Sequence, residues 1–158
     1  EKLKQESKKN GTVGCVVLDK QGNLTAGTST GGMFKKRWGR IGDSPVIGAG
    51  TYADNNSCAV SCTGHGEYFI RHAVAFDVCA RYKYLKESVE KAADYIIHTE
   101  LNTNAGNGGL IAVDKLGNIA MPYNSGGMFR GFLYKEKGSP EIKKGCGIGK
   151  KIVVVGEK

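Results

Sequence analysis

A threonine between two glycines, in the stretch Gly11-Thr12-Val13-Gly14, opens the first apolar run of the sequence. A threonine hydroxyl is a weak nucleophile at neutral pH and becomes effective when a neighbouring base takes its proton. Cleavage of the peptide bond between Gly11 and Thr12 would supply that base, because a freed α-amino group has an ordinary pKa of about 8. A glycine before the threonine leaves its carbonyl unshielded and permits a strained turn. The stretch therefore fits a self-cleaving N-terminal nucleophile, and it also fits an ordinary loop that leads into a strand.

An arginine and an aspartate flank a glycine in the stretch Gly39-Arg40-Ile41-Gly42-Asp43-Ser44-Pro45. The planar fork of arginine donors binds a carboxylate at two points, and an aspartate can receive an ammonium group. Arg40 and Asp43 could therefore hold the two charged ends of an amino acid. Few apolar residues surround them, so we expect both side chains to point outward, and the alternative is a surface ion pair.

A further hydroxyl residue, Thr63, precedes Gly64 in the stretch Ser61-Cys62-Thr63-Gly64-His65-Gly66. Apolar residues recur at helical spacing over residues 67–85, so the stretch lies just ahead of a helix N-terminus. Backbone N–H groups and the positive end of the helix dipole meet there, which suits a developing oxyanion. The alternative is that Thr63 is simply the N-cap of the helix.

The elements that must position these residues alternate between strands and helices. Strands at residues 13–18 and 24–30, joined by a turn at 19–23, form a predicted hairpin. We further expect short buried strands at 46–52 and 58–62, a second helix at 88–99 with Ser88 as its N-cap, and a last strand at 152–155. This order predicts an α/β layered domain with both helices on one side of the sheets.

Two segments of the sequence repeat at a distance of 95 residues. Asp19-Lys20-Gln21-Gly22-Asn23-Leu24 recurs as Asp114-Lys115-Leu116-Gly117-Asn118-Ile119, and Gly31-Gly32-Met33-Phe34 recurs as Gly126-Gly127-Met128-Phe129. Two copies are too few for a solenoid, so we expect two related hairpins in paired sheets. The second copy has asparagine in place of the threonine, so only the first carries a candidate nucleophile.

The formal charge of +8 raises nucleic acid as a partner, since 23 Lys and Arg residues outnumber 15 Asp and Glu residues. The basic residues gather in segments 2–9 and 135–158 without interleaved aromatic residues, so we expect solvated tails rather than a nucleic-acid platform. No apolar run is long enough to predict a membrane span.

Five cysteines show no CxxC pair, which favours free thiols and a reducing, cytoplasmic compartment without assigning one. Cys15, Cys58 and Cys79 lie among apolar residues, where a thiol behaves as a small hydrophobe. The three histidines lack the spacing of metal ligands, so we expect no metal and no other cofactor.

Five motifs, taken in order, resemble those of a known family. They are Gly11-Thr12-Val13-Gly14, Thr28-Ser29-Thr30-Gly31-Gly32, Gly39-Arg40-Ile41-Gly42-Asp43-Ser44-Pro45, Gly48-Ala49-Gly50-Thr51-Tyr52 and Thr63-Gly64-His65-Gly66-Glu67. Over roughly residues 8–134 the chain resembles the β subunit of the plant-type L-asparaginase/isoaspartyl peptidase family, which belongs to the N-terminal-nucleophile hydrolases. The resemblance implies a layered αββα sandwich, of which this chain is only the C-terminal, β-subunit half. Residues 1–11 would be the polar linker that ends the α subunit, and residues 12–158 the catalytic half-domain.

The resemblance also implies catalytic roles. The precursor cuts itself between Gly11 and Thr12, and Thr12 then attacks the side-chain amide of asparagine or a β-aspartyl peptide bond, with its own amine as general base. Thr30 supports and tunes the Thr12 hydroxyl. Thr63 and the N–H group of Gly64 stabilise the oxyanion.

Binding roles and partners are implied in the same way. Arg40 grips the α-carboxylate of the substrate, Asp43 holds its α-amino group, and Gly66 lines the pocket. The family pairs this half with an α subunit from the same precursor, in an (αβ)2 heterotetramer. Phe34-Lys35 and the basic end beyond residue 135 depart from the family's pattern. An inactive relative that keeps only the fold and a basic nucleic-acid-binding module are the alternatives.

Overall fold

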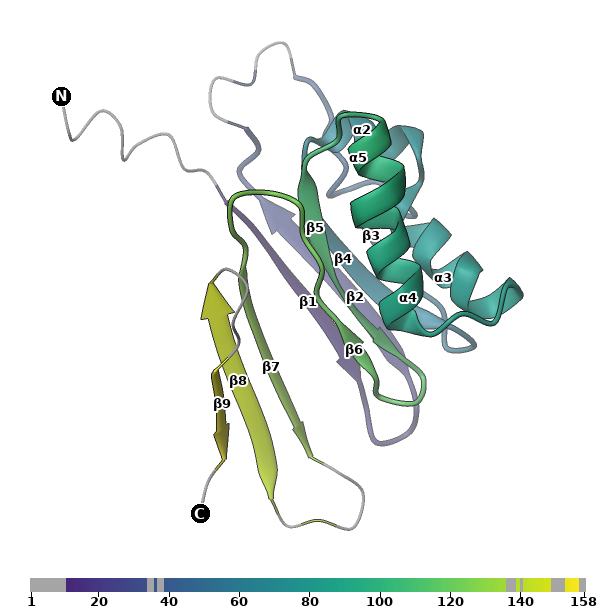
Figure 1. Ribbon diagram of the computed structural model, residues 1–158, viewed down its shortest axis with the longest axis vertical. Coiled ribbons are helices and arrows are strands. Elements are labelled where there is room, and N and C mark those ends of the chain that lie inside the picture. Colours follow the sequence, from purple (N-terminus) through teal and green to yellow (C-terminus); the bar gives the residue numbers. More distant parts are fainter. Residues whose placement is uncertain are drawn as a thin grey trace, which may run out of the picture.

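The computed structural model of this chain describes residues 11–33, 36, 39–135, 139, 141–148 and 153–156. The polar linker expected at the start of the sequence lies outside these residues, apart from Gly11. The described part is a mixed α/β structure with three antiparallel sheets (Figure 1).

The first sheet is the predicted hairpin, formed by β1 (Thr12–Leu18) and β2 (Leu24–Thr30). Its register places Thr12 opposite Thr30 at one end and Leu18 opposite Leu24 at the other. The turn closes because the Asp19 side chain accepts hydrogen bonds from the backbone N–H groups of Gln21 and Asn23, at 2.8 and 2.7 Å. Local turn chemistry therefore determines which residues of β1 and β2 face each other.

The second sheet has four strands in the order β3-β4-β5-β6. The strands are β3 (Thr51–Ala53), β4 (Cys58–Gly64), β5 (Gly108–Asp114) and β6 (Ile119–Ala120). The strand expected over residues 46–52 is shorter than predicted, because residues 46–50 fold into turns. Gly48 has a φ of +91°, and a Cβ at Gly50 would lie 2.6 Å from the carbonyl carbon of Asp43. The positive φ of Gly48 interrupts the extended conformation, and Gly50 packs directly against the Asp43 backbone.

The repeat predicted from the sequence is confirmed in the two turns. Asp114 accepts hydrogen bonds from the N–H groups of Leu116 and Asn118, as Asp19 does from its own turn. Gly22 and Gly117 both have a φ of +88°, which only glycine adopts without strain. The two copies lie in different sheets, because Asp19 follows β1 and Asp114 follows β5.

The helical segment after β4 contains more elements than predicted. Its members are α2 (Gly66–Arg71), α3 (Val74–Tyr84), α4 (Val89–Tyr95), the π-helical η1 (Ile96–Glu100) and α5 (Leu101–Thr103). The single helix expected over residues 67–85 is interrupted because Ala73 adopts a left-handed conformation, with a φ of 45°. The prediction that Ser88 caps the next helix is confirmed, since its hydroxyl accepts a hydrogen bond from the Lys91 N–H group.

These elements form three layers (Figure 1). One apolar cluster, which includes Val60, Phe69 and Ile96, fills the space between the second sheet and the helices. A smaller cluster, which includes Leu24 and Val113, lies between the second sheet and the β1–β2 hairpin. The helices therefore cover one side of the sheets, as predicted.

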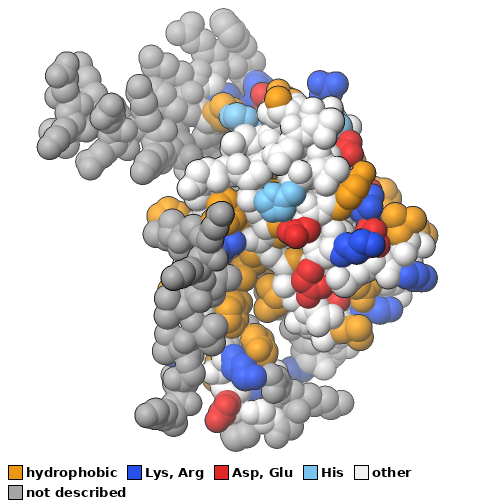
Figure 2. Space-filling view, in the orientation of Figure 1, with side chains coloured by type: hydrophobic (Ala, Val, Ile, Leu, Met, Phe, Trp, Pro, Cys, Tyr) orange, Lys and Arg blue, Asp and Glu red, His pale blue; other side chains and the backbone are white. Residues whose placement is uncertain are grey.

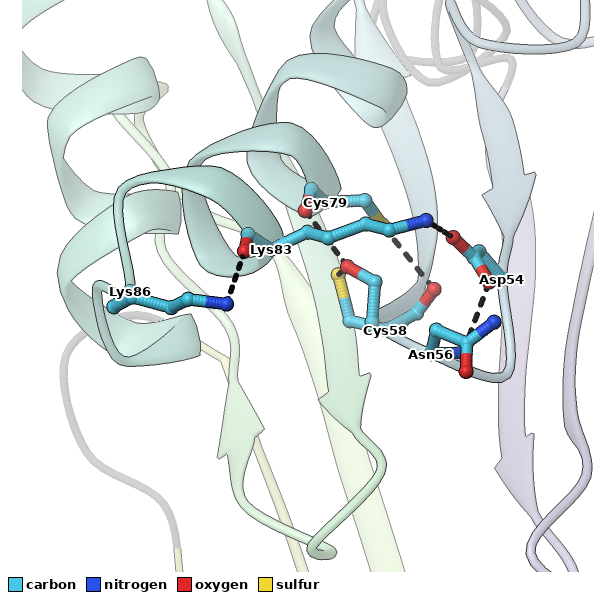
Figure 3. Close-up of polar contacts among 7 residues, drawn as sticks. Asp54, Asn56, Cys58, Cys79, Lys83 and Lys86 are labelled. Atoms are coloured by element: carbon cyan, nitrogen blue, oxygen red, sulfur yellow. Dashed lines mark hydrogen bonds and ion pairs between the residues drawn. The ribbon is translucent and has the colours of Figure 1, made fainter.

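Polar contacts anchor α3 to the start of β4 (Figure 3). The Ser57 hydroxyl donates to the Cys79 carbonyl oxygen at 2.7 Å, and the Cys79 thiol donates to the Cys58 carbonyl oxygen at 3.2 Å. Lys83 on the same helix reaches Asp54 in the turn before β4, with 2.9 Å between Nζ and Oδ2. Helix and strand are thus held together at the end of the sheet away from Thr63.

The third sheet corrects the expectation for the basic C-terminal segment. It consists of β7 (Phe129–Lys135), β8 (Ile142–Ile148) and β9 (Val153–Gly156), in that order. Residues 142–148 are therefore a paired strand rather than a solvated tail, and the last strand begins one residue later than predicted. In Figure 1 this sheet lies on the side of the hairpin away from the helices.

Acidic and basic side chains are mixed on the helical side of the molecule (Figure 2). Arg81 and Lys91 both pair with Glu87 there, at 2.9 and 3.4 Å. The described part of this face therefore presents no continuous basic surface. No helix among the described residues is long and apolar enough to cross a membrane.

Candidate active site

A cavity of about 600 Å³ opens where the β1–β2 hairpin meets the end of β4. All eight residues singled out from the sequence line it: Gly11, Thr12, Thr30, Arg40, Asp43, Thr63, Gly64 and Gly66. They come from the first and second sheets, from the loop after β2 and from the start of α2. The structure therefore brings together residues that are up to 55 positions apart in the sequence.

Thr12 lies on the first position of β1 with its hydroxyl oriented by a neighbour. Thr12 Oγ1 donates to Thr30 Oγ1 at 3.1 Å, and the two residues face each other in the hairpin register. Thr30 Oγ1 also accepts from the N–H group of Gly32 at 3.0 Å. No described atom other than those of its chain neighbours lies within 4 Å of the position that a Cβ on Gly11 would take. A hydroxyl held by a second hydroxyl, on the residue that follows Gly11, is compatible with nucleophilic self-cleavage.

A hydroxyl pair joins the two sheets behind Thr12. Thr28 Oγ1 lies 2.6 Å from Ser61 Oγ and donates to the Gly50 carbonyl oxygen at 3.0 Å. A Cβ on Gly14 would lie 2.1 Å from Ser61 Oγ, so β1 approaches β4 this closely only because residue 14 is glycine. This contact sets the separation between Thr12 on one sheet and Thr63 on the other.

Thr63 and Gly64 are the last two residues of β4. The following helix, α2, begins at Gly66 with His65 as its N-cap, so the alternative that Thr63 is the N-cap is wrong. Gly64 has a φ of +152°, and a Cβ there would lie 2.3 Å from the Asn107 carbonyl oxygen. The strand thus ends in a tightly packed glycine immediately before a helix N-terminus, where a hydroxyl and backbone groups lie at the cavity wall.

Arg40 forms its ion pair with Glu67 in the first turn of α2, and not with Asp43. Hydrogen bonding at its own backbone N–H group, together with the Arg40 guanidinium, lowers the pKa of the Glu67 carboxyl. The Arg40 side chain remains 37% exposed, so part of its guanidinium is accessible from solvent. Arg40 also directs Nη1 towards Met33 Sδ at 4.0 Å.

Asp43 is buried, with 6% of its surface exposed, which corrects the expectation that it points outward. Gly50 and Gly66 pack against it, and a Cβ on Gly66 would lie 2.8 Å from Asp43 Oδ1. Burial raises the pKa of this carboxyl, although backbone hydrogen bonds and Arg40 act in the opposite direction. Asp43 Oδ2 has no hydrogen-bond partner among the described residues. A buried carboxylate oxygen without a partner is suited to receive an ammonium group.

Sequence reasoning missed three contributors to this site. Thr28 could have been found, because it lies two residues before Thr30 and so faces the same side of β2. Ser61 bears the same relation to Thr63 on β4. Lys36 also lines the cavity, and its position in an irregular loop carried no pattern that could have predicted this.

No group of three His, Cys, Asp or Glu side chains in the described part of the chain could hold a metal ion.

Comparison with known proteins finds a matching family and relatives of similar sequence. The asparaginase family model matches residues 1–142. The isoaspartyl peptidase of Salmonella typhimurium is 54% identical over 129 residues, which cover 82% of this chain and 41% of that protein. The Escherichia coli isoaspartyl peptidase is 49% identical over 143 residues, covering 84% of this chain and 44% of that protein. The isoaspartyl peptidase/L-asparaginase of Mus musculus is 47% identical over 125 residues. The chain spans about two fifths of the length of these relatives.

Proposed function

This chain belongs to the asparaginase family, which contains isoaspartyl peptidases and L-asparaginases, and from that premise we propose that it is the nucleophile-bearing part of a self-processing amidohydrolase. Its substrates are L-asparagine and β-aspartyl dipeptides. The observation that carries the proposal is a single cavity lined by a hydrogen-bonded threonine pair, a buried carboxylate and an arginine.

Self-processing begins when Thr12 Oγ1 attacks the carbonyl carbon of Gly11. The peptide C–N bond breaks, the α-amino group of Thr12 takes a proton, and Gly11 is left as an ester of the threonine hydroxyl. Water then hydrolyses the ester, which frees both the Gly11 carboxylate and the Thr12 hydroxyl. The lack of a side chain on Gly11 and the hydrogen bond from Thr12 to Thr30 support this step.

Substrate hydrolysis uses the same hydroxyl. The freed amine of Thr12 takes the hydroxyl proton as the oxygen attacks the side-chain carbonyl carbon of the substrate. Thr63 and the Gly64 N–H group stabilise the oxyanion that forms, and each such donor typically contributes ~10²–10³ in rate. Ammonia or an amino acid leaves with the proton, and water releases aspartate from the resulting ester. Thr30 orients the nucleophile throughout.

Two charged side chains that line the cavity, Arg40 and Asp43, bind the substrate. Arg40 binds the α-carboxylate, and its ion pair with Glu67 supports a fixed orientation of the guanidinium. Asp43 binds the α-ammonium group, which compensates the cost of burying its unpartnered oxygen. Gly66 leaves room beside Asp43 that any side chain would occupy.

The whole enzyme requires the part of the protein that this chain does not span. We assign residues 1–11 to the linker that ends the α subunit and residues 12–158 to the catalytic half-domain. Val13 and Val17, on the outer face of β1, are 69% and 47% exposed. A helical layer from the α subunit over this face would complete a four-layer αββα sandwich, and two such αβ units would form the heterotetramer.

Expression of the full-length precursor tests the proposal. Mass spectrometry should find a cut immediately before Thr12, and the purified protein should release aspartate from β-aspartyl dipeptides or asparagine. Thr12→Ala should abolish both events, whereas Thr12→Ser should retain partial activity because it keeps a hydroxyl. If the alanine variant still hydrolyses either substrate, Thr12 is not the nucleophile. A wild-type protein that is neither cut nor active would instead be an inactive relative.

A further inference from the structure

Lys36 lies on the rim of the same cavity, between two glycine-containing segments. Its backbone N–H group donates to the Met33 carbonyl oxygen at 3.1 Å. A Cβ on Gly32 would lie 3.5 Å from Lys36 Nζ, and one on Gly42 would lie 3.7 Å from it. The ammonium group is therefore located between the turn that contacts Thr30 and the loop that carries Asp43.

The charges around the cavity exceed what an asparagine molecule can match. Arg40, Asp43 and Lys36 are the charged residues among those that line it. An α-carboxylate and an α-ammonium group account for Arg40 and Asp43 under the proposed function. No acidic side chain in the described ranges pairs with Lys36. One cation at the rim is thus left for a further negative group.

The two proposed substrates differ in that negative group. Asparagine carries one carboxylate, whereas a β-aspartyl dipeptide carries a second one at the C-terminus of its leaving residue. We propose that Lys36 binds this second carboxylate and makes the cavity select β-aspartyl dipeptides over asparagine. The inference rests on the proposed function, because it assigns the aspartyl end of the substrate to Arg40 and Asp43.

A lysine suits this role better than a second arginine would. Its ammonium is a point charge on a flexible stem, so it can follow leaving residues of different size. The rim is exposed, which limits the contribution of the ion pair, while the carboxylate of a bound substrate is partly removed from water. We expect the contribution of Lys36 to be about three- to tenfold in kcat/KM.

The experiment compares three substrates on the processed full-length enzyme: β-aspartyl-leucine, β-aspartyl-leucine amide and asparagine. Lys36→Met keeps the aliphatic stem and removes the charge, and Lys36→Arg keeps the charge. Lys20→Met in the Asp19 turn is the matched control, because it removes the same charge outside the cavity. Mass spectrometry of the Thr12 N-terminus and thermal unfolding verify that each variant is folded and processed.

We expect Lys36→Met to lower the ratio of kcat/KM for β-aspartyl-leucine to that for asparagine by about three- to tenfold, mainly through KM. For the same variant, kcat/KM for β-aspartyl-leucine should no longer exceed kcat/KM for β-aspartyl-leucine amide. Lys36→Arg and Lys20→Met should preserve the wild-type ratio. An equal effect of Lys36→Met on all three substrates, or no effect on any, would overturn the inference while leaving the proposed function intact. A wild-type enzyme that is processed and hydrolyses none of them would overturn both.

Discussion

At the scale of single residues, the two charged groups of the Arg40–Asp43 loop behave differently. Arg40 is half-buried at the surface and is paired with Glu67. Exposed ion pairs contribute about 0.2–1 kcal/mol to stability, so this pair matters for orientation more than for folding. Asp43 is buried and lacks a partner for one oxygen, so its charge costs stability in the absence of a ligand.

Asp43→Asn is therefore expected to stabilise the free protein and to weaken substrate binding. Burial raises the pKa of Asp43 above its ordinary value of 3.8, so the native state binds more protons than the unfolded state between the two pKa values. The contribution of Asp43 to the free energy of unfolding then falls as pH rises through that window. Asp43→Asn should remove this fall, because asparagine does not ionise. Thermal unfolding should show a higher Tm for Asp43→Asn than for the wild type at neutral pH, and no such difference below the ordinary pKa.

The kinetic effect of the same variant should be the opposite. Loss of the carboxylate that binds the α-ammonium group should lower kcat/KM by about ten- to a hundredfold, mainly through KM. In the wild type, KM should rise as pH falls through the raised pKa, because the protonated carboxyl no longer binds the ammonium group. Asp77→Asn is the control, since burial also raises the pKa of Asp77 and this residue lies outside the cavity. Similar losses of substrate affinity in both variants would contradict the role of Asp43.

At the scale of elements, the site depends on how closely β1 approaches β4. The contact between Gly14 and Ser61 allows the two sheets to meet at the Thr28–Ser61 hydroxyl pair. Thr12 and Thr63 lie at the cavity ends of these two strands. A change in the separation of the sheets would therefore displace the nucleophile from the proposed oxyanion site.

Gly14→Ala is expected to destabilise the protein by about 1–3 kcal/mol and to slow cleavage before Thr12, because the new methyl group overlaps Ser61. Urea unfolding and the rate of precursor processing measure the two effects. Gly27→Ala on β2 is the matched control, since no described residue other than its chain neighbours lies within 4 Å of the position of its Cβ. Adding Ser61→Gly to Gly14→Ala should restore part of the stability by making room. A Gly14→Ala protein as stable and as readily processed as Gly27→Ala would show that the spacing is not critical.

At the scale of the whole molecule, the outer face of the β1–β2 hairpin is left exposed by the residues that the structure describes. Cys15 lies on this face beside Val13 and Val17 and is exposed, although its neighbours in the sequence are apolar. Cys58, Cys62 and Cys79 are buried, as their apolar surroundings indicate. The pKa of the Cys79 thiol is raised, chiefly by a hydrogen bond with the Cys58 side chain and secondly by burial. Burial also raises the pKa of the Cys62 thiol.

Cysteine alkylation can therefore report whether the proposed α subunit covers this face. In the chain described here, the exposed Cys15 should react readily with a maleimide, whereas Cys58, Cys62 and Cys79 should remain unmodified because their side chains are buried and inaccessible to the reagent. In the full-length precursor, Cys15 should react at least about tenfold more slowly, as for a thiol removed from solvent. Mass spectrometry of tryptic peptides distinguishes the sites. Equal reactivity of Cys15 in both proteins would contradict the proposed four-layer assembly.

The local elements of this protein are determined by its sequence, because their causes act over a few residues. The Asp19 and Asp114 turns, the β1–β2 hairpin and the Ser88 cap follow from side chains that hydrogen-bond to nearby backbone. The residue types of the cavity, with a threonine after a glycine and an arginine and an aspartate three positions apart, were also readable from the sequence. Their proposed roles depend on the family resemblance and stay predictions.

The tertiary structure alone decided the environment of those residues. Asp43 is buried because Gly50 and Gly66, from other segments, pack against it, and Arg40 turns to Glu67 because α2 begins beside it. Lys36 reaches the cavity from an irregular loop, and Ala73 interrupts a helix whose apolar spacing continues past it. Burial, charge pairing and the distance between sheets arise from contacts between segments far apart in the chain, so no local pattern of residues can specify them.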